Sequence, residues 1–289
     1  MDTLFEINHL QCSYDKHPQP GRSKIVLDIE HLELPKGKKV FIVGESGIGK
    51  STILEVLGLM NNTVIPNEKS RFTFYDKGVP VDILQMWKRK NDRELSEFRR
   101  NHFNFIFQST NLMRNFTAYE NISITRMLQG YSQTSTYAIA KKVLDDLGLG
   151  HIDEVRMAQE LSGGQQQRLA FARAILPDFT VLFGDEPTGN LDSENAVRAM
   201  ELLSNKLAEL QGSSAIIVSH DMNLAVSFAD IIVKVKKVEV NPQNAHEEPS
   251  FYGHIDDTCV YRKTNEGNWA NGTNCIDSIH FVSFLKSLN

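Results

Sequence analysis

The sequence is poor in cysteine and contains no long apolar run. Its three cysteines are Cys12, Cys259 and Cys275. Their odd number and the lack of paired CxxC spacing argue against a disulfide framework or a zinc site and favour reduced thiols. No run of 18 apolar residues occurs, and no basic start is followed by an apolar segment. We therefore expect no membrane span, no secretion signal and a cytoplasmic location.

An excess of positive charge is also lacking. The chain has 31 Lys and Arg against 36 Asp and Glu, which gives a formal net charge of −5. A general nucleic-acid binder needs a basic surface to meet phosphate backbones, so no nucleic-acid partner is expected. With 289 residues the chain is long enough to bury a sizeable core, in one large or two small domains.

What the sequence does contain is a complete phosphate loop, GESGIGKST. The loop follows an apolar strand pattern at Val40–Val43 and precedes a helical pattern at Ser51–Met60, which is the order that such a loop requires. Its glycines leave the backbone able to turn N–H groups inward around phosphates. Lys50 supplies a positive charge, and Ser51 supplies a hydroxyl for Mg²⁺. The residues predicted to hold the nucleotide here are Gly44, Glu45, Ser46, Gly47, Ile48, Gly49, Lys50, Ser51 and Thr52.

Two carboxylates follow a second apolar run. Thr180 to Phe183 is typical of a buried parallel strand, and Gly184, Asp185 and Glu186 follow it. Ligands bind at the carboxyl edge of open α/β sheets, so these side chains are expected beside the nucleotide. Asp185 is placed to hold Mg²⁺, and Glu186 is placed to orient or deprotonate the attacking water.

Two further strand-like runs end in polar side chains. Ala215–Val218 leads to His220, which we expect near the γ-phosphate. Phe103–Phe107 leads to Gln108, whose amide can reach the metal and the water. Both side chains are therefore candidate catalytic groups, and Gln108 is also a candidate metal ligand.

The segment LSGGQQQR, from Leu161 to Arg168, is the most specific motif. Ser162 is a good N-cap for a helix that continues until Pro177. Ser162, Gly163 and Gly164 should then present free N–H groups at a positive helix end.

With these loops in order, the chain resembles the nucleotide-binding subunit of an ATP-binding cassette (ABC) transporter over about residues 3–240. The resemblance implies an ATPase with ATP and Mg²⁺ as its ligands. It identifies the phosphate loop at Gly44–Ser51, the glutamine loop at Gln108, the signature at Leu161–Gln165, the metal and base carboxylates at Asp185 and Glu186, the D-loop at Asn190, Leu191 and Asp192, the switch histidine at His220, and the adenine-stacking aromatic at Tyr14. Tyr14 is alternatively a strand-end aromatic, because residues 16–22 make an excursion directly after it.

The same resemblance implies a head-to-tail homodimer around two ATP. The signature residues Ser162, Gly163, Gly164 and Gln165 would point at the γ-phosphate bound by the other copy. One chain would therefore lack half of each active site, and hydrolysis would let the two copies part.

The expected fold is α/β, with a P-loop NTPase core that has a mostly parallel sheet, an antiparallel β subdomain and a helical subdomain inserted at about 91–160. We expect residues 1–240 to form the ATPase domain and residues 241–289 to form a small C-terminal extension. In the extension, NPQNAHEEP reads as a linker and YRKTNEGNW as a strand and turn, and one helical stripe contains Ile276, Ile279, Val282, Leu285 and Leu288. The extension could pack on its own core, pair with its dimer mate or bind a membrane partner.

A group of large apolar residues follows Gln108, namely Leu112, Met113, Phe116 and Tyr119. They are either helical-subdomain core or, as the resemblance implies, a groove for a cytoplasmic helix of a membrane partner. The segments EPTGNLDSEN and FQSTNLMRNFTAYENI are most similar to the group that serves lipoprotein release, macrolide efflux and bacterial cell division. We therefore expect a subunit on the inner face of the cell membrane, held there by a permease-like partner. The alternative is a soluble ABC ATPase that acts as a regulatory switch.

Overall fold

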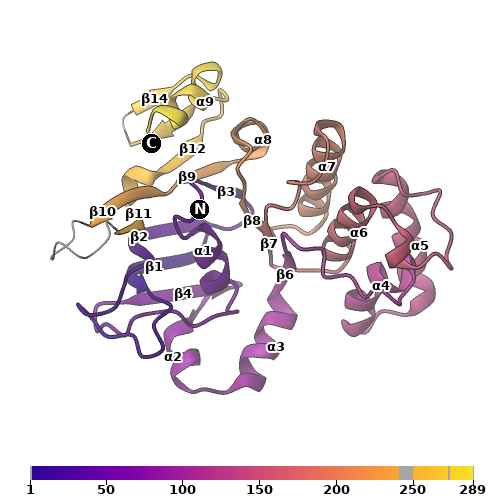
Figure 1. Ribbon diagram of the computed structural model, residues 1–289, viewed down its shortest axis with the longest axis horizontal. Helices are drawn as coiled ribbons and strands as arrows, with labels where there is room; N and C mark the ends of the chain where they lie inside the picture. Colours follow the sequence, from indigo (N-terminus) through magenta and orange to yellow (C-terminus); the bar gives the residue numbers. More distant parts are fainter. Residues whose placement is uncertain (1, 241–249, 273, 289) are drawn as a thin grey trace. The chain divides into compact units, whose positions relative to one another are not determined.

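The computed structural model describes residues 2–240, 250–272 and 274–288 (Figure 1). The chain forms two compact units. The first unit contains Met1–Arg99 and Val218–Asn289, and the second contains Arg100–Ile217. Among the described residues, no helix is both long and apolar enough to cross a membrane.

A six-stranded sheet forms one part of the first unit. All its pairs are antiparallel except that between β11 and β2, which is parallel. In spatial order the strands are β10 (Lys236–Val240), β11 (Ser250–Ile255), β2 (Leu27–Pro35), β1 (Thr3–Cys12), β4 (Arg71–Asp76) and β5 (Val79–Asp82). Phe5 packs against Phe74 with ring centroids 5.2 Å apart, and both side chains are fully buried. This sheet is the antiparallel subdomain that the sequence predicts.

A second run of strands in the first unit leads to the phosphate loop. In spatial order it contains β14 (Asn274–Ile276), β13 (Trp269–Asn271), β12 (Val260–Lys263), β9 (Ile231–Lys234) and β3 (Lys39–Val43). The pair β3–β9 is parallel, whereas β9, β12, β13 and β14 pair antiparallel. The helices of this unit are α1 (Lys50–Leu57), α2 (Ile83–Lys88), α8 (Met222–Phe228) and α9 (Ser278–Ser287).

The second unit is mostly helical. Its helices are α4 (Ala118–Leu128), α5 (Gln133–Asp146), α6 (Gly163–Ile175) and α7 (Ser193–Glu209). Its strands are β6 (Phe103–Ile106) and β7 (Val181–Asp185), which pair in parallel, and β8 (Ser214–Val218), which lies next to β7. The helix α3 (Asp92–His102) contains the boundary between the units in sequence. The buried strands are short and apolar because both faces of a parallel sheet are covered.

The C-terminal extension joins both strand systems of the first unit. Its β11 pairs with β2 and β10, and its β12 pairs with β9. Figure 1 shows the extension in yellow, with α9 beside the short strands. Trp269 is fully buried and stacks on Phe281 of α9, with ring centroids 4.8 Å apart. Of the three roles that the sequence leaves open, packing within its own chain is therefore the one observed.

The strand and turn predicted in YRKTNEGNW are confirmed by β12 and β13, but the predicted helical stripe is wrong. Asp277 caps α9, so Ile276 lies in β14 before the helix begins. Ile279 is 82 % exposed, and Phe281 and Leu285 are the buried residues of α9. The aromatic cluster around Trp269 decides which face is buried. The predicted linker falls on residues 241–249, which lie outside the described residues. The division into domains at about residue 240, and the helical subdomain at 91–160, stay predictions.

Candidate nucleotide-binding site

The phosphate loop connects β3 to α1 in the first unit. Gly47 and Gly49 have φ angles of 77° and 91°, in the left-handed region that favours glycine. Gly49 is also confined by space, because a Cβ built on it would lie 3.0 Å from the Val26 carbonyl oxygen. Gly49 is the N-cap of α1, and no side chain caps this helix. The first turn of α1 is therefore open to an anion.

Lys50 lies inside the loop. Its Nζ donates to the carbonyl oxygens of Gly44 at 3.0 Å and Glu45 at 2.5 Å, and the residue is only 5 % exposed. Ser51 is exposed beside it. A buried ammonium next to an uncapped helix start fits a phosphate group, and the Ser51 hydroxyl fits a hard cation such as Mg²⁺.

Tyr14 is placed by α1. Its hydroxyl contacts Thr52 Oγ1 at 3.0 Å and donates to Glu55 Oε2 at 2.9 Å. Burial of the hydroxyl and the neighbouring Glu55 carboxylate raise its pKa, although the hydrogen bond with Thr52 opposes them. The residue is 53 % exposed, so ring surface stays open close to the phosphate-loop helix. Its role in stacking on adenine stays a prediction.

His220 follows β8 and is exposed. The N–H of the preceding Ser219 donates to the Ile42 carbonyl oxygen of β3 at 3.3 Å. His220 therefore follows a residue that is hydrogen-bonded to β3, the strand that precedes the phosphate loop. Asp221, the next residue, caps α8 through the N–H groups of Asn223 and Leu224.

The two carboxylates lie in the second unit. Asp185 ends β7, and Glu186 has a φ angle of 48°, which is unusual for a residue with a side chain. Backbone strain of this kind is typical of residues whose side chains must be aimed. The Gly189 N–H donates to the Glu186 carbonyl oxygen at 3.1 Å and closes the turn. A Cβ on Gly189 would lie 3.4 Å from Glu186 Oε2, so the carboxylate lies over this turn.

Gln108 lies at the same end of the sheet as these carboxylates. The parallel register pairs Ile106 of β6 with Gly184 of β7, so Gln108 and Asp185 both lie at the carboxyl ends of adjacent strands. Phe105 and Phe183 stack with ring centroids 5.3 Å apart and hold the two strands together. Gln108 itself is exposed.

The signature lies at the start of α6, also in the second unit. Ser162 is the N-cap; its Oγ accepts from the Gln165 N–H at 3.4 Å, and Gln165 Oε1 accepts from the Ser162 N–H at 2.9 Å. The expectation that the Ser162 N–H is free is therefore wrong, because the side chain of Gln165 reaches back to it. A Cβ on Gly163 or Gly164 would meet nothing within 4 Å, so the helix start is open at the glycines.

One contact was missed by reasoning from sequence. Gln167 of α6 is 1 % exposed, and its Nε2 donates to the Pro187 carbonyl oxygen at 3.2 Å. This bond ties the signature helix to the turn that follows Glu186. The run of three glutamines was a signal, since Gln167 falls on the buried face of a helix that Ser162 caps.

Asp192 of the predicted D-loop caps α7. Its Oδ1 accepts from the Asn195 N–H at 2.9 Å and its Oδ2 from Asn195 Nδ2 at 2.6 Å. These hydrogen bonds hold the pKa of the Asp192 carboxyl below its usual value.

Comparison with known proteins agrees with this geometry. The family model of the ABC transporter matches residues 27–189. The lipoprotein-releasing system ATP-binding protein LolD of Myxococcus xanthus is 38 % identical over 224 residues, which cover 78 % of this chain and 92 % of the relative. The macrolide export ATP-binding/permease protein MacB of Neisseria meningitidis is 36 % identical over 220 residues, which cover 76 % of this chain but 32 % of the relative. The chain thus spans about a third of that longer protein.

Solved structures match as well. The dimeric structure of MJ0796, a bacterial ABC transporter cassette, has a TM-score of 0.64 and 29 % identity, covering 80 % of this chain and 94 % of the other. A post-hydrolysis state of the same cassette bound to ADP and phosphate has a TM-score of 0.62 and 28 % identity, with the same coverage. The predicted α/β cassette fold is confirmed. The chain therefore belongs to the ABC transporter family, and it is an ABC ATPase.

Proposed function

We propose that the chain is the ATP-binding and hydrolysing subunit of a bacterial transporter-type complex. It works as a head-to-tail homodimer around two ATP and drives a permease-like membrane partner, which keeps it on the inner face of the cell membrane. The observation that carries the proposal is the uncapped start of α1, where Gly49 and the buried Lys50 leave an anion site open. The likeness to a LolD protein and to a dimeric cassette supports it.

The nucleotide phosphates are assigned to the loop from Gly44 to Thr52. Ser51, Gln108 and Asp185 offer a hydroxyl, an amide and a carboxylate oxygen, which are ligands that Mg²⁺ prefers. When bound, Mg²⁺ neutralises charge on the phosphates. Glu186 accepts a proton from the attacking water or orients it, and His220 assists near the γ-phosphate.

The direct test is the Glu186→Gln variant. It keeps the shape of the side chain and removes its basicity, so turnover should fall by a factor on the order of 10² or more while ATP still binds. The variant should accumulate as a dimer in Mg·ATP, measured by size-exclusion chromatography with light scattering. Glu201→Gln, on the exposed face of α7, is the matched control and should behave as wild type. A Glu186→Gln chain that stays monomeric and hydrolyses normally contradicts the proposal.

A surface for the membrane partner is assigned to the segment after Gln108. Tyr119 is buried and packs on Tyr137, so it belongs to the core, whereas Phe116 is 39 % exposed. Thr117, the residue after Phe116, forms a β-bridge with Met157. The exposed apolar side chain of Met157 therefore lies near that of Phe116. An apolar surface of this kind favours a partner over a soluble switch.

Charged replacements test this surface. Leu112→Glu and Phe116→Glu should abolish capture of the membrane subunit and leave nucleotide affinity unchanged, measured by pull-down and by titration of the isolated chain. Ile139→Glu, at an equally exposed apolar residue of α5, is the control. If the charged variants keep the partner, the surface is assigned wrongly. If no membrane protein copurifies with wild type, the soluble switch is the better function.

A further inference from the structure

We propose that β11, the first strand of the C-terminal extension, is a positioning element for the phosphate loop, so that the affinity for nucleotide phosphates depends on this strand. The inference rests on the proposed function, because it requires the loop at 44–52 to bind phosphates. Gly253 of β11 acts directly on Ile48 of the loop. Phe251 of β11 acts through Lys237 of β10 on Glu45.

Gly253 lies against the backbone of the loop. A Cβ built on it would lie 2.1 Å from the Ile48 carbonyl oxygen and 2.9 Å from Val235 Cγ1. Both distances are shorter than van der Waals contact allows, so glycine is required here by close approach. The Gly253 N–H donates to the Val26 carbonyl oxygen at 3.0 Å, and a Cβ on Gly49 would lie 3.0 Å from that same oxygen. The Val26 carbonyl oxygen therefore accepts a hydrogen bond from β11 and leaves little room for a side chain at Gly49, the N-cap of α1.

A second connection runs through side chains. Lys237 Nζ lies 3.1 Å from Glu45 Oε2 and 4.8 Å from the ring centroid of Phe251. The Glu45 carbonyl oxygen accepts from Lys50 Nζ at 2.5 Å. A continuous series of contacts thus joins β11 to the lysine that would meet the phosphates. The Lys237 and Glu45 side chains are 35 % and 37 % exposed, so solvent screens their attraction and its effect should be modest.

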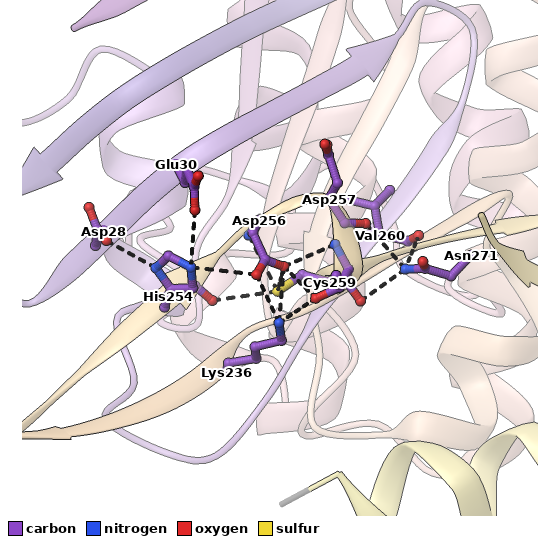
Figure 2. Close-up of polar contacts among 10 residues, drawn as sticks. Asp28, Glu30, Lys236, His254, Asp256, Asp257, Cys259, Val260 and Asn271 are labelled. Carbon is purple, nitrogen blue, oxygen red and sulfur yellow. Dashed lines mark hydrogen bonds and ion pairs between the residues drawn. The ribbon is translucent and has the colours of Figure 1, made fainter. Parts of the chain in front are cut away.

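The strand can position the loop because it is itself held on both sides. Figure 2 shows His254 beside Asp28 of β2, with His254 Nδ1 3.0 Å from Asp28 Oδ2, and Lys236 of β10 beside Asp256, with Nζ 2.9 Å from Oδ2. Although burial opposes it, hydrogen bonds from Thr258 and Lys236 hold the pKa of the Asp256 carboxyl well below its usual range. A strand fixed to two neighbours resists displacement. A side chain added at Gly253 should therefore displace the loop rather than the strand.

The competing interpretation is that β11 only stabilises the fold. In that case a substitution in β11 lowers stability and leaves nucleotide affinity unchanged. The experiment therefore compares two glycines of the extension in the full chain. Gly253→Ala crowds the loop. Gly267→Ala strains a turn, because Gly267 has a φ angle of 87°, but a Cβ there meets nothing within 4 Å.

Calorimetric titration with Mg·ADP measures affinity, and thermal unfolding measures stability. Gly253→Ala should weaken Mg·ADP binding by a factor on the order of ten, since a small displacement of phosphate-binding groups is costly. Gly267→Ala should lower the unfolding midpoint and keep the affinity within about twofold of wild type.

A second pair covers the case in which Gly253→Ala does not fold. Lys237→Met removes the contact with Glu45 and should weaken binding by about two- to fivefold, with a smaller difference at high salt. Lys263→Met is its control, because Lys263 of β12 also lies over an aromatic ring, with Nζ 5.6 Å from the Trp269 ring centroid, and its Nζ donates to the Val226 carbonyl oxygen at 3.4 Å, outside the loop. The control should bind Mg·ADP as wild type does.

The outcomes separate the two proposals. If wild type and Lys50→Ala bind Mg·ADP equally, the assignment of the phosphate loop fails. If Lys50→Ala loses binding while the folded Gly253→Ala and Lys237→Met chains bind as tightly as wild type, only the role of β11 is overturned. If each control loses as much affinity as its partner variant, the loss is not specific to the contacts of β11 with the loop, and the role of β11 is likewise overturned.

Discussion

Two helices of this protein, α1 and α6, begin at glycine-containing turns, but only α6 has a side-chain cap at its N-terminus. Gly49 precedes α1 in a left-handed conformation, and no side chain caps the helix. Ser162 precedes α6 with extended backbone, and its side chain and that of Gln165 form a capping box. Lys50 at the first start is buried, whereas Ser162 at the second is exposed.

The difference indicates what kind of ligand contact each helix start is suited to. The first N–H groups of α1 need an acceptor from outside the helix, and a bound phosphate would supply it. A ligand that binds only the folded chain stabilises it by RT ln(1 + [L]/Kd), so nucleotide bound at α1 should raise the stability of the folded chain. At the start of α6 the capping box pairs the N–H groups of Ser162 and Gln165, so this helix start does not depend on a ligand. It is therefore suited to a transient contact, such as the partner's nucleotide in the proposed dimer.

The largest expected effect comes from blocking each start in turn. Lys50→Ala removes the charge at α1, and Ser162→Arg puts bulk and positive charge at α6, so each homodimer should lose hydrolysis completely. A mixture of the two chains contains mixed dimers with one intact site. About a quarter of wild-type activity should return, because about half of the dimers are mixed and each has one site of two.

The control for this mixing is a chain with both substitutions. Combined with Lys50→Ala it cannot form an intact site, so no activity should return. Full activity of Ser162→Arg alone, or no recovery in the first mixture, would show that the two starts do not act on one nucleotide.

Much of this contrast could be predicted from the sequence, because loops and caps are local. The strand expected at Val40–Val43 is observed at Lys39–Val43, and the helix expected at Ser51–Met60 is observed at Lys50–Leu57. The cap at Ser162 was expected from its own hydroxyl and the helix that follows. Turn chemistry of this kind depends on a few neighbouring residues.

What depends on distant pairing could not be predicted. The parallel pairing of β11 with β2, in which Gly253 lies opposite Leu27, joins the two chain segments of the first unit. Nothing in the local pattern of either strand specifies this pairing. The sequence places Ile279 and Leu285 on one helical stripe, but Ile279 is exposed and Leu285 is buried, because the aromatic packing of Trp269 on Phe281 selects another face of α9. The hydrogen bond from the Ser162 N–H to Gln165 Oε1 is by contrast local, because a serine followed three residues later by glutamine is typical of a capping box.

The next largest effect should come from Gly49→Ala. A left-handed φ angle of 91° costs a residue with a side chain about 1–2 kcal/mol, and the added Cβ would lie 3.0 Å from the Val26 carbonyl oxygen. We expect a lower unfolding midpoint and an affinity for Mg·ATP weakened on the order of tenfold. Thermal unfolding with and without nucleotide measures both. An alanine that is tolerated without loss of affinity would mean that the uncapped start does not bind phosphate.

Gly163→Ala should have the opposite effect on stability. The glycine lies within α6 at its first turn, and a Cβ there meets nothing within 4 Å. Alanine is the better helix former, so stability should rise by about 0.5 kcal/mol. Hydrolysis should nevertheless fall severalfold, because in the proposed dimer the methyl group would lie where the partner's phosphate must approach. If hydrolysis is unchanged in a chain that still dimerises, that approach does not occur at Gly163.

The smallest effect is expected for Ser162→Ala, which removes the cap of α6 without adding bulk. Its hydrogen bond to the Gln165 N–H is long, at 3.4 Å, so the loss should be near the low end of the usual range, about 0.5 kcal/mol. Ser132→Ala is the matched control, because Ser132 caps α5 in the same unit and accepts from the Ser135 N–H at 3.2 Å. Both variants should lose similar stability in urea unfolding and bind Mg·ATP as wild type. Only Ser162→Ala should slow hydrolysis, by about two- to fivefold, since in the proposed dimer its helix start contributes to the partner's site. Equal hydrolysis by the two variants would leave the cap of α6 with a structural role alone.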